Sequence, residues 1–311
     1  MLVKILSKKI FFVQILLGIA FLVLFFIQHF TQIVDWQSII GVLSYLLTSG
    51  VLCVFFIHSK LVKPTSIPFW FLLIWLLTFS DLALDYRLSL SFLFSTLLFW
   101  RFLVAQDQPE TKNSIFEIGV LLSVSSFFYP PSIFLSGLIL LNYFYIQSFN
   151  FRAILLFIIG LFIPMVIGLE LTYLIGDTEW IENYKSQFCL SLWSSGFWFL
   201  IPIGFLIVLS WIDHLTHSNV QDIHKRQLYF LTFLYFINYL IIIVLFSGGN
   251  PNTLAFLGLP LTVFLTRFTQ YQSIFKVREL LLWFYLGVML LYYFQKEVLE
   301  IYQDLLGNIS F

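Results

Sequence analysis

Two carboxylates with helical spacing occur in the short polar motif Asp81-Leu-Ala-Leu-Asp85-Tyr-Arg87. Residues four apart lie on one face of a helix, so a helical conformation would place Asp81 and Asp85 side by side. Such a pair is able to grip a metal ion or a sugar hydroxyl. We therefore take Asp81 and Asp85 as candidate catalytic residues and the adjacent Arg87 as a candidate substrate-binding residue. Asp35 is a third candidate catalytic residue, because it falls at the same predicted outer face.

A further carboxylate, Glu170, stands inside a long apolar run. It follows Gly160, Pro164 and Gly168, whose spacing of four forms a stripe of small residues suited to close helix packing. An ionisable group inside a membrane span costs about 3 kcal/mol to hold there, so it is a functional candidate by default. Glu170 is thus a second candidate substrate-binding residue; the alternative is that it simply reaches water at the outer interface.

Composition places these residues in a membrane protein. The 311 residues are 60% hydrophobic and only 10% charged, whereas a soluble chain carries roughly 25% charged residues. Uncharged blocks such as 10–34, 186–212 and 227–266 are long enough for spans of about 20 residues. The zero net charge gives no support to a nucleic-acid partner, and the His and Asp residues of 213–224 match no zinc spacing, so we predict no metal site and assign no cofactor.

The pattern predicts an all-α polytopic bundle that forms a single transmembrane domain over 1–311. Backbone groups in lipid must be satisfied within each segment, so runs this short must be helices. About eleven hydrophobic helices are expected, at 10–30, 38–58, 66–82, 87–104, 114–128, 131–147, 152–175, 190–212, 227–247, 252–268 and 279–295. The segment 114–147, hinged at Pro130-Pro131, forms either two short spans or one re-entrant hairpin.

Basic residues set the predicted orientation. With a cytoplasmic N-terminus, 13 of the 16 Lys and Arg residues lie inside and only Arg87, Lys185 and Lys296 lie outside. The C-terminus is then external, and 296–311 has apolar residues at helical spacing that predict an amphipathic tail on the membrane surface. Asp35, Asp81 and Asp85 fall at the outer face, where acids are also tolerated without any function because basic residues are excluded.

Several segments resemble a known family. They are Asp85-Tyr86-Arg87, the run from Ser123 to Pro131 (Ser-Val-Ser-Ser-Phe-Phe-Tyr-Pro-Pro), Phe151-Arg152 and Gly160-Leu-Phe-Ile-Pro164. Together they are similar to an uncharacterised family of multi-pass inner-membrane proteins of Bacteroidetes. The resemblance implies a location in the cell inner membrane and no known activity.

A looser resemblance is to polytopic lipid-linked glycosyltransferases. Those enzymes keep an acidic residue in the first outer loop, where Asp35 stands, and have Pro-rich breaks near the outer face, as at Pro130-Pro131. The resemblance implies an outer carboxylate acting as general base on an acceptor hydroxyl, and a cation or Arg87 balancing the phosphate of a polyprenyl donor. The first outer loop, about 31–37, is much shorter than in those enzymes.

Three functions follow as hypotheses. The first is a glycosyltransferase-like envelope protein that handles lipid-linked sugars at the outer face. The second is a non-enzymatic subunit or scaffold whose partners are other envelope membrane proteins, because no P-loop, dinucleotide fingerprint, zinc-protease motif or nucleophile elbow is present. The third is a small-solute transporter built around Glu170.

Overall fold

The computed structural model describes residues 2–7, 11–33, 35–58, 61–107, 112–145, 151–175, 184, 186–188, 201–216, 223–248, 250–272 and 274–307. These residues form helices and no strands, which confirms the all-α class. The α-helices are α1 Leu2–Leu6, α2 Phe11–His29, α3 Trp36–His58, α4 Ile67–Thr78, α5 Tyr86–Asp107, α6 Lys112–Phe128, α7 Leu135–Tyr145, α8 Phe151–Ile175, α10 Ile201–Thr216, α11 Ile223–Phe246, α12 Gly258–Tyr271 and α13 Phe275–Gly307. The 3-10 segments are η1 Ser80–Leu84, η2 Pro130–Phe134 and η5 Pro251–Leu257.

Six of the described helices are long and apolar enough to cross a membrane. They are Phe12–His29, Trp36–His58, Tyr86–Ala105, Phe151–Leu174, Lys225–Phe246 and Phe275–Phe294. They coincide with six of the predicted spans and support the assignment to a membrane. The count of eleven spans and the cytoplasmic N-terminus stay predictions.

Three predicted spans differ from continuous helices. The prediction of single helices over 66–82, 131–147 and 252–268 is wrong in detail, because each is an α-helix joined to a 3-10 segment (η1, η2 and η5). The α-helical part of the first, α4, has 12 residues and so spans only about 18 Å of a core about 30 Å thick. Irregular backbone at membrane depth must be buried in protein. Accordingly η1 packs against α3 and α5, and η2 and η5 both pack against α11.

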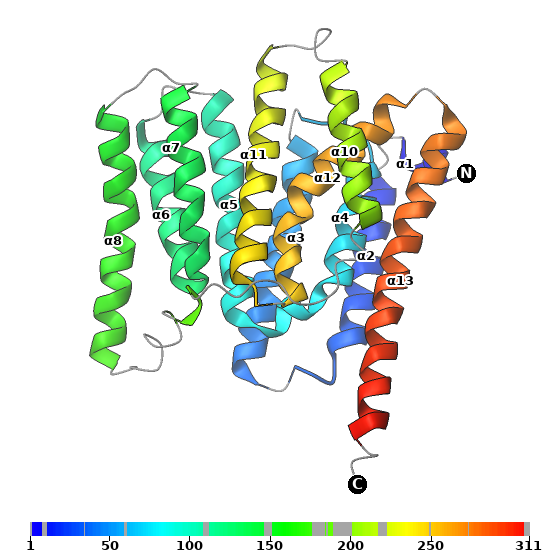
Figure 1. Ribbon diagram of the computed structural model, residues 1–311, viewed down its shortest axis with the longest axis horizontal. Helices are drawn as coiled ribbons and strands as arrows, with labels where there is room; N and C mark the ends of the chain where they lie inside the picture. Colours follow the sequence, from blue (N-terminus) through cyan, green and yellow to red (C-terminus); the bar gives the residue numbers. More distant parts are fainter. Residues whose placement is uncertain are drawn as a thin grey trace.

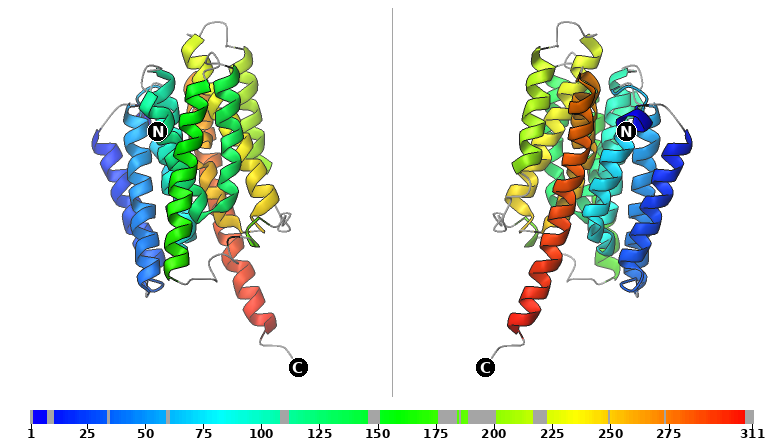
Figure 2. Two further views of the ribbon diagram at one scale, coloured as in Figure 1. Left: turned by 90° about the vertical axis from the view of Figure 1, so that its left-hand side faces the viewer. Right: turned by 90° about the vertical axis from the view of Figure 1, so that its right-hand side faces the viewer.

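The helices stand roughly parallel to one another, with α8 at one edge and α2 and α13 at the other (Figure 1). α8 packs on α6, α6 on α5, and α5 on α3. Two further views show α13 continuing beyond the other helices toward the C-terminus (Figure 2). α13 has 33 residues, about 50 Å at 1.5 Å per residue. Residues 296–307 therefore prolong the axis of this helix, and the surface position of the tail stays a prediction.

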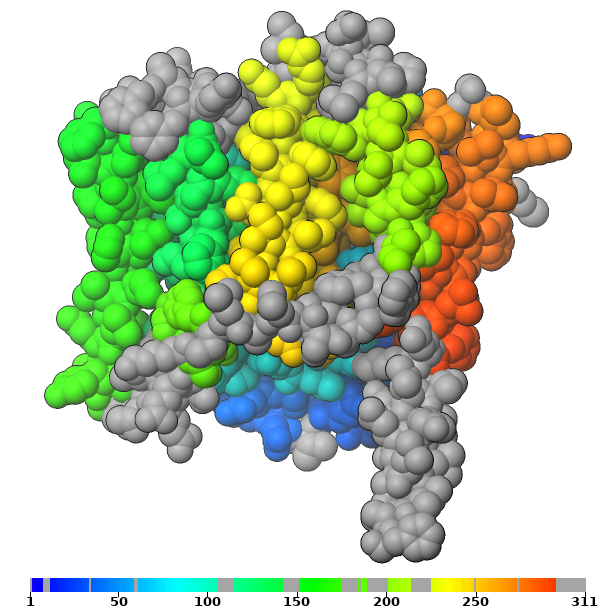
Figure 3. All heavy atoms as spheres, viewed as in Figure 1, coloured from blue at the N-terminus to red at the C-terminus, as the bar shows by residue number. Residues whose placement is uncertain are grey.

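The centre of the bundle is formed by α12 and α4. Every residue of α12 from Gly258 to Gln270 is buried, with α10, α11, α4 and α13 around it. Figure 3 shows α11 and α10 in front of α12. Trp75 of α4 donates its indole N–H to the backbone oxygen of Leu254 at 3.1 Å, so α4 is tied directly to η5. A helix surrounded by protein needs no lipid-facing apolar stripe, which explains why α12 carries Thr262, Thr266 and Arg267.

The N-terminus of the chain contacts the beginning of the last helix, α13, at the side that we predict to be cytoplasmic. The backbone N–H groups of Leu2 and Val3 donate to the two carboxylate oxygens of Glu279 at 2.8 and 2.9 Å. A carboxylate satisfies the free N–H groups at a helix N-terminus and favours its dipole. Glu279, which sits one turn inside α13, therefore fixes the short helix α1 against the last helix of the bundle.

Candidate functional site

The segment η1 positions the predicted pair Asp81 and Asp85, but not as an α-helix would. Asp81 lies in the first turn of η1, and Asp85 ends it in an extended conformation (φ −95°, ψ 102°). The α-helical conformation that would place the two carboxylates on one face is therefore not the one that this segment adopts. The chain turns between them because Asp85 must start the next helix, α5.

Asp85 acts as the N-cap of α5. Its Oδ1 atom accepts hydrogen bonds from the backbone N–H groups of Arg87 at 2.9 Å and Leu88 at 3.3 Å. This is the usual role of an aspartate directly before a helix, where the first N–H groups have no partner within the helix. The side chain is exposed, so the cap does not remove its charge from solvent.

Replacing Asp85 with alanine is expected to lower the free energy of unfolding by about 1 kcal/mol, because two backbone N–H groups at the start of α5 lose their acceptor. Asp85→Asn keeps an acceptor oxygen and is expected to lose much less. Thermal unfolding of the two purified variants in detergent checks this. Equal losses in both variants would show that the negative charge, and not the capping bond, stabilises α5.

Asp81 belongs to a buried polar cluster where α2 ends. His29 is fully buried; its Nδ1 atom lies 2.9 Å from Oε1 of Gln32 and its Nε2 atom 2.8 Å from Oγ of Ser80. An amide oxygen only accepts, so Nδ1 carries the proton and Nε2 accepts from the Ser80 hydroxyl. Oδ1 of Asp81 lies 3.8 Å from Nε2, within ion-pair range of a protonated ring.

This cluster resembles a nucleophile and base oriented by an amide, but the Ser80 side chain is fully buried. The observed role of the cluster is to connect the end of α2 to η1 through the hydrogen bond between His29 and Ser80. His29 is not among the five candidate residues that the sequence indicates. Ser80 and Gln32 gave no signal, because they are common polar residues 48 positions apart.

A polar cavity of about 560 Å³ opens where α5 begins. It is lined by Gln37, Leu84, Asp85, Tyr86, Arg87, Ser186 and Gln187. Nε of Arg87 donates to the Tyr86 hydroxyl at 3.0 Å, and its guanidinium lies 5.6 Å from the centre of the Tyr86 ring. Among the described residues no carboxylate pairs with Arg87. The Gln187 Oε1 atom is buried and has no hydrogen-bond partner within the described part of the chain.

The remaining predicted site residues do not reach this cavity. Asp35 is exposed, and its backbone oxygen accepts from Ser38 Oγ at 2.6 Å and Ile39 N at 3.1 Å to begin α3. Glu170 is exposed on α8, the edge helix that packs on α6 (Figure 1). Of the five candidates, the structure gathers only Asp85 and Arg87 in one cavity.

An apolar groove of about 350 Å³ reaches the end of α4 at Thr78, two residues before η1 begins. It lies between α2, α4 and α13 and is lined mainly by leucine, isoleucine and methionine; Gln28, Thr78 and Tyr293 are the lining residues with polar side-chain atoms. Gln28 immediately precedes His29, and Thr78 comes two residues before Ser80. The groove thus ends at the level of the His29 cluster, while the polar cavity lies at the far end of η1.

No group of three or more His, Cys, Asp or Glu side chains that would hold a metal ion occurs in the described residues. Several residues of the inner loop 213–224, including His217 and Asp222, lie outside them. A family model described as a family of unknown function (DUF6427) matches residues 1–302. Neither a curated protein nor a solved structure matches the chain.

Proposed function

Because the chain belongs to this family of unknown function, we propose its role from its own geometry: it is an inner-membrane protein of the cell envelope that binds the sugar-phosphate head of a lipid at its outer face. The observation that carries the proposal is the polar cavity at the start of α5, with Arg87 and Asp85 in its wall. The cavity is large enough for a sugar, since small-ligand sites measure about 300–1,000 Å³.

The residue types of the cavity suit a sugar phosphate. A guanidinium with free N–H groups binds phosphate oxygens through charge-assisted hydrogen bonds, and Arg87 keeps its terminal nitrogens free of carboxylates among the described residues. Asp85, Gln37 and Gln187 supply acceptors and donors for hydroxyl groups, and Tyr86 supplies an aromatic face. The Oε1 atom of Gln187 is buried and has no partner among the described residues, which favours a bound donor, because an unsatisfied buried oxygen costs about 1–3 kcal/mol.

The apolar groove beside η1 suits the lipid part of the same ligand. Its walls come from three helices, two of which, α2 and α13, are long enough to cross a membrane. A polyprenyl chain lying there would place its phosphate near the level of η1. This arrangement joins a hydrocarbon site and a polar site through one short segment of chain.

Catalysis is the less favoured part of the hypothesis. A transferase of the lipid-linked type needs a carboxylate beside the acceptor hydroxyl, but Asp35, Asp81 and Glu170 lie apart from the cavity. Asp85 is the one candidate base there, and it already caps α5. Binding or presentation of a lipid-linked sugar therefore fits better than its transfer.

A second candidate, a non-enzymatic subunit of an envelope complex, is favoured by the filled interior. Large aromatic side chains such as Trp75, Tyr45 and Tyr285 are fully buried in the core. The transporter hypothesis has lost its main support, because Glu170 lies exposed on the edge helix.

Replacing Arg87 with glutamine is expected to weaken binding of a polyprenyl-phosphate sugar by about 10- to 100-fold, since charge-assisted hydrogen bonds contribute about 1.5–3 kcal/mol. Native mass spectrometry of the purified chain with a short-chain polyprenyl diphosphate sugar measures it. Arg226→Gln, an exposed arginine at the other end of the bundle, is the matched control. Equal affinity of Arg87→Gln and wild type would rule out the proposed site.

A separate variant, Asp85→Asn, keeps the cap of α5. It tests for transfer of the sugar, which is measured by the surface-glycan profile of cells.

A further inference from the structure

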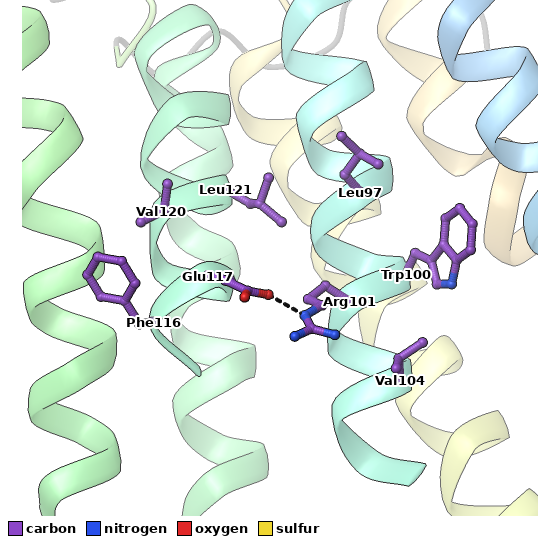
Figure 4. A pocket seen from close by; sticks show the side chains of 8 residues that line it. All are labelled: Leu97, Trp100, Arg101, Val104, Phe116, Glu117, Val120 and Leu121. Atoms are coloured by element: carbon purple, nitrogen blue, oxygen red, sulfur yellow. Dashed lines mark hydrogen bonds and ion pairs between the residues drawn. The ribbon is translucent and has the colours of Figure 1, made fainter. Parts of the chain in front are cut away.

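A second cleft, far from η1, lies between α5 and α6 near the ends that we predict to be cytoplasmic. Its volume is about 610 Å³. Leu97, Arg101 and Val104 line it from α5 at helical spacing, and Glu117, Val120 and Leu121 line it from α6 (Figure 4). None of these six side chains is fully buried, so the cleft opens outward from the bundle.

The cleft is apolar except for one ion pair. Nε of Arg101 and Oε2 of Glu117 point toward each other across it (Figure 4). The Arg101 side chain is 33% exposed and the Glu117 side chain 48%. Within the described residues, neither the terminal guanidinium nitrogens nor the second carboxylate oxygen has a further hydrogen-bond partner. Among the described residues, each charge therefore keeps hydrogen-bonding capacity that no protein group uses.

The position of the Arg101–Glu117 pair along α5 and α6 indicates which part of the bilayer lies beside it. Arg101 stands six residues before the end of α5 at Asp107, and Glu117 five residues after the start of α6 at Lys112. At 1.5 Å per residue both lie about 8–9 Å from these ends, close to the thickness of one headgroup layer, about 5–8 Å. The predicted topology puts these helix ends at the cytoplasmic membrane surface, so the pair is expected near the boundary between headgroups and hydrocarbon, where lipid phosphates and their substituents lie.

The chemistry of the cleft is complementary to one class of lipid. A guanidinium with free N–H groups needs an anion with several acceptor oxygens, which a phosphate provides. A carboxylate with a free oxygen needs a cationic donor, which a primary ammonium provides. The apolar wall formed by Leu97, Val104 and Leu121 needs a hydrocarbon chain. A purely anionic lipid would leave Glu117 facing a negative charge.

We propose that the α5–α6 cleft binds an aminophospholipid, whose phosphate contacts Arg101, whose ammonium contacts Glu117 and whose acyl chain lies on the apolar wall. This site is independent of the sugar-phosphate site at η1. It gives α5 and α6 a lipid partner near the end of α5 opposite to Arg87, which stands at the start of that helix.

The test is lipid retention by the full chain released from nanodiscs that contain equal amounts of phosphatidylethanolamine, phosphatidylcholine and phosphatidylglycerol. Native mass spectrometry is expected to show phosphatidylethanolamine retained at least about fivefold over each other lipid. Glu117→Gln is expected to abolish the preference over phosphatidylcholine, and Arg101→Gln to reduce retention of all three phospholipids. Glu170→Gln, an exposed glutamate on α8, is the control and should leave the preference unchanged.

Two further arms keep the test decisive. If the single variants do not fold, the double variant Arg101→Leu/Glu117→Leu replaces them. It removes both charges together, which apolar surroundings tolerate. This double variant is expected to lose the preference for phosphatidylethanolamine. Retention without headgroup preference in wild type would overturn the proposal. So would a second copy of the chain seated on this cleft, shown by a dimer that Arg101→Leu/Glu117→Leu dissociates.

Discussion

Replacing Gly160 with leucine is expected to lower the free energy of unfolding by about 3 kcal/mol or to release α8 from the bundle. A Cβ atom at Gly160 would lie 2.5 Å from the backbone oxygen of Phe116, and one at Gly119 would lie 2.5 Å from the backbone oxygen of Phe157. Backbone atoms on both sides cannot move aside separately, so the two helices must separate. The gain in helix propensity, about 1 kcal/mol for removing a glycine, is too small to offset this. Thermal unfolding in detergent measures the loss.

The chain offers two matched controls for this prediction. Gly137 on α7 has nothing within 4 Å of its Cβ position, so Gly137→Leu should be neutral or mildly stabilising. Gly168 on α8 faces the ring of Phe127, a side chain that is able to rotate, so Gly168→Ala should cost less than Gly160→Ala. If Gly160→Leu and Gly137→Leu unfold alike, the close approach of α6 and α8 is not what holds α8 in place.

Ser95→Ala is expected to lower the free energy of unfolding by about 1–3 kcal/mol. The Ser95 hydroxyl lies 2.7 Å from the Ser125 hydroxyl and accepts from the Tyr239 hydroxyl at 2.6 Å. It therefore joins α5, α6 and α11 at a fully buried point. Hydrogen bonds between membrane helices average about 0.6 kcal/mol and reach about 1.7, so two lost bonds give this range. Denaturant unfolding in mixed micelles is the measurement.

Ser123→Ala is the matched control for Ser95→Ala, because it removes a buried serine hydroxyl that makes no hydrogen bond to the described residues. Ser123 is as buried as Ser95, each 1% exposed, but its hydroxyl has no partner among the described residues. Because removing an unsatisfied buried hydroxyl relieves a desolvation penalty, Ser123→Ala should be neutral or stabilising. A loss in Ser123→Ala as large as that in Ser95→Ala would mean that packing, and not hydrogen bonding, accounts for both.

Part of the site could be predicted from the sequence because its residues are close together in the chain. Asp85 and Arg87 are two residues apart, so any fold that exposes one brings the other close. The stripe of Gly160 and Gly168 likewise follows from helical periodicity, and the prediction that it packs closely on another helix is confirmed by the contacts with Phe116 and Phe127 of α6. Features whose members lie within one helix, or within a few residues of one another, need no knowledge of the rest of the chain.

Other parts were beyond sequence reasoning because their partners lie far apart. His29 meets Ser80 across 51 positions, and Tyr239 meets Ser95 across 144. The breaks at η1 and η5 were missed for a related reason. Hydropathy records only that a segment is apolar, whereas a 3-10 turn is tolerated at membrane depth only if neighbouring helices bury it. The separation of Asp81 from Asp85 follows from such a break.

The sequence by itself determined the class of this protein, because its few charges and long apolar blocks predict helices in a bilayer. So apolar a surface would be poorly hydrated in water, and backbone groups without hydrogen bonds are too costly in lipid. The sequence also determined which polar residues deserve a test. Only the tertiary structure decided which of them act together, since it turned Asp85 into the cap of α5, placed Arg87 in a cavity with Gln187, fixed Asp81 against His29 and left Glu170 exposed on an edge helix. The physical reason is that apolarity fixes the depth of each helix in the membrane, whereas side-chain packing between helices fixes its neighbours and rotation.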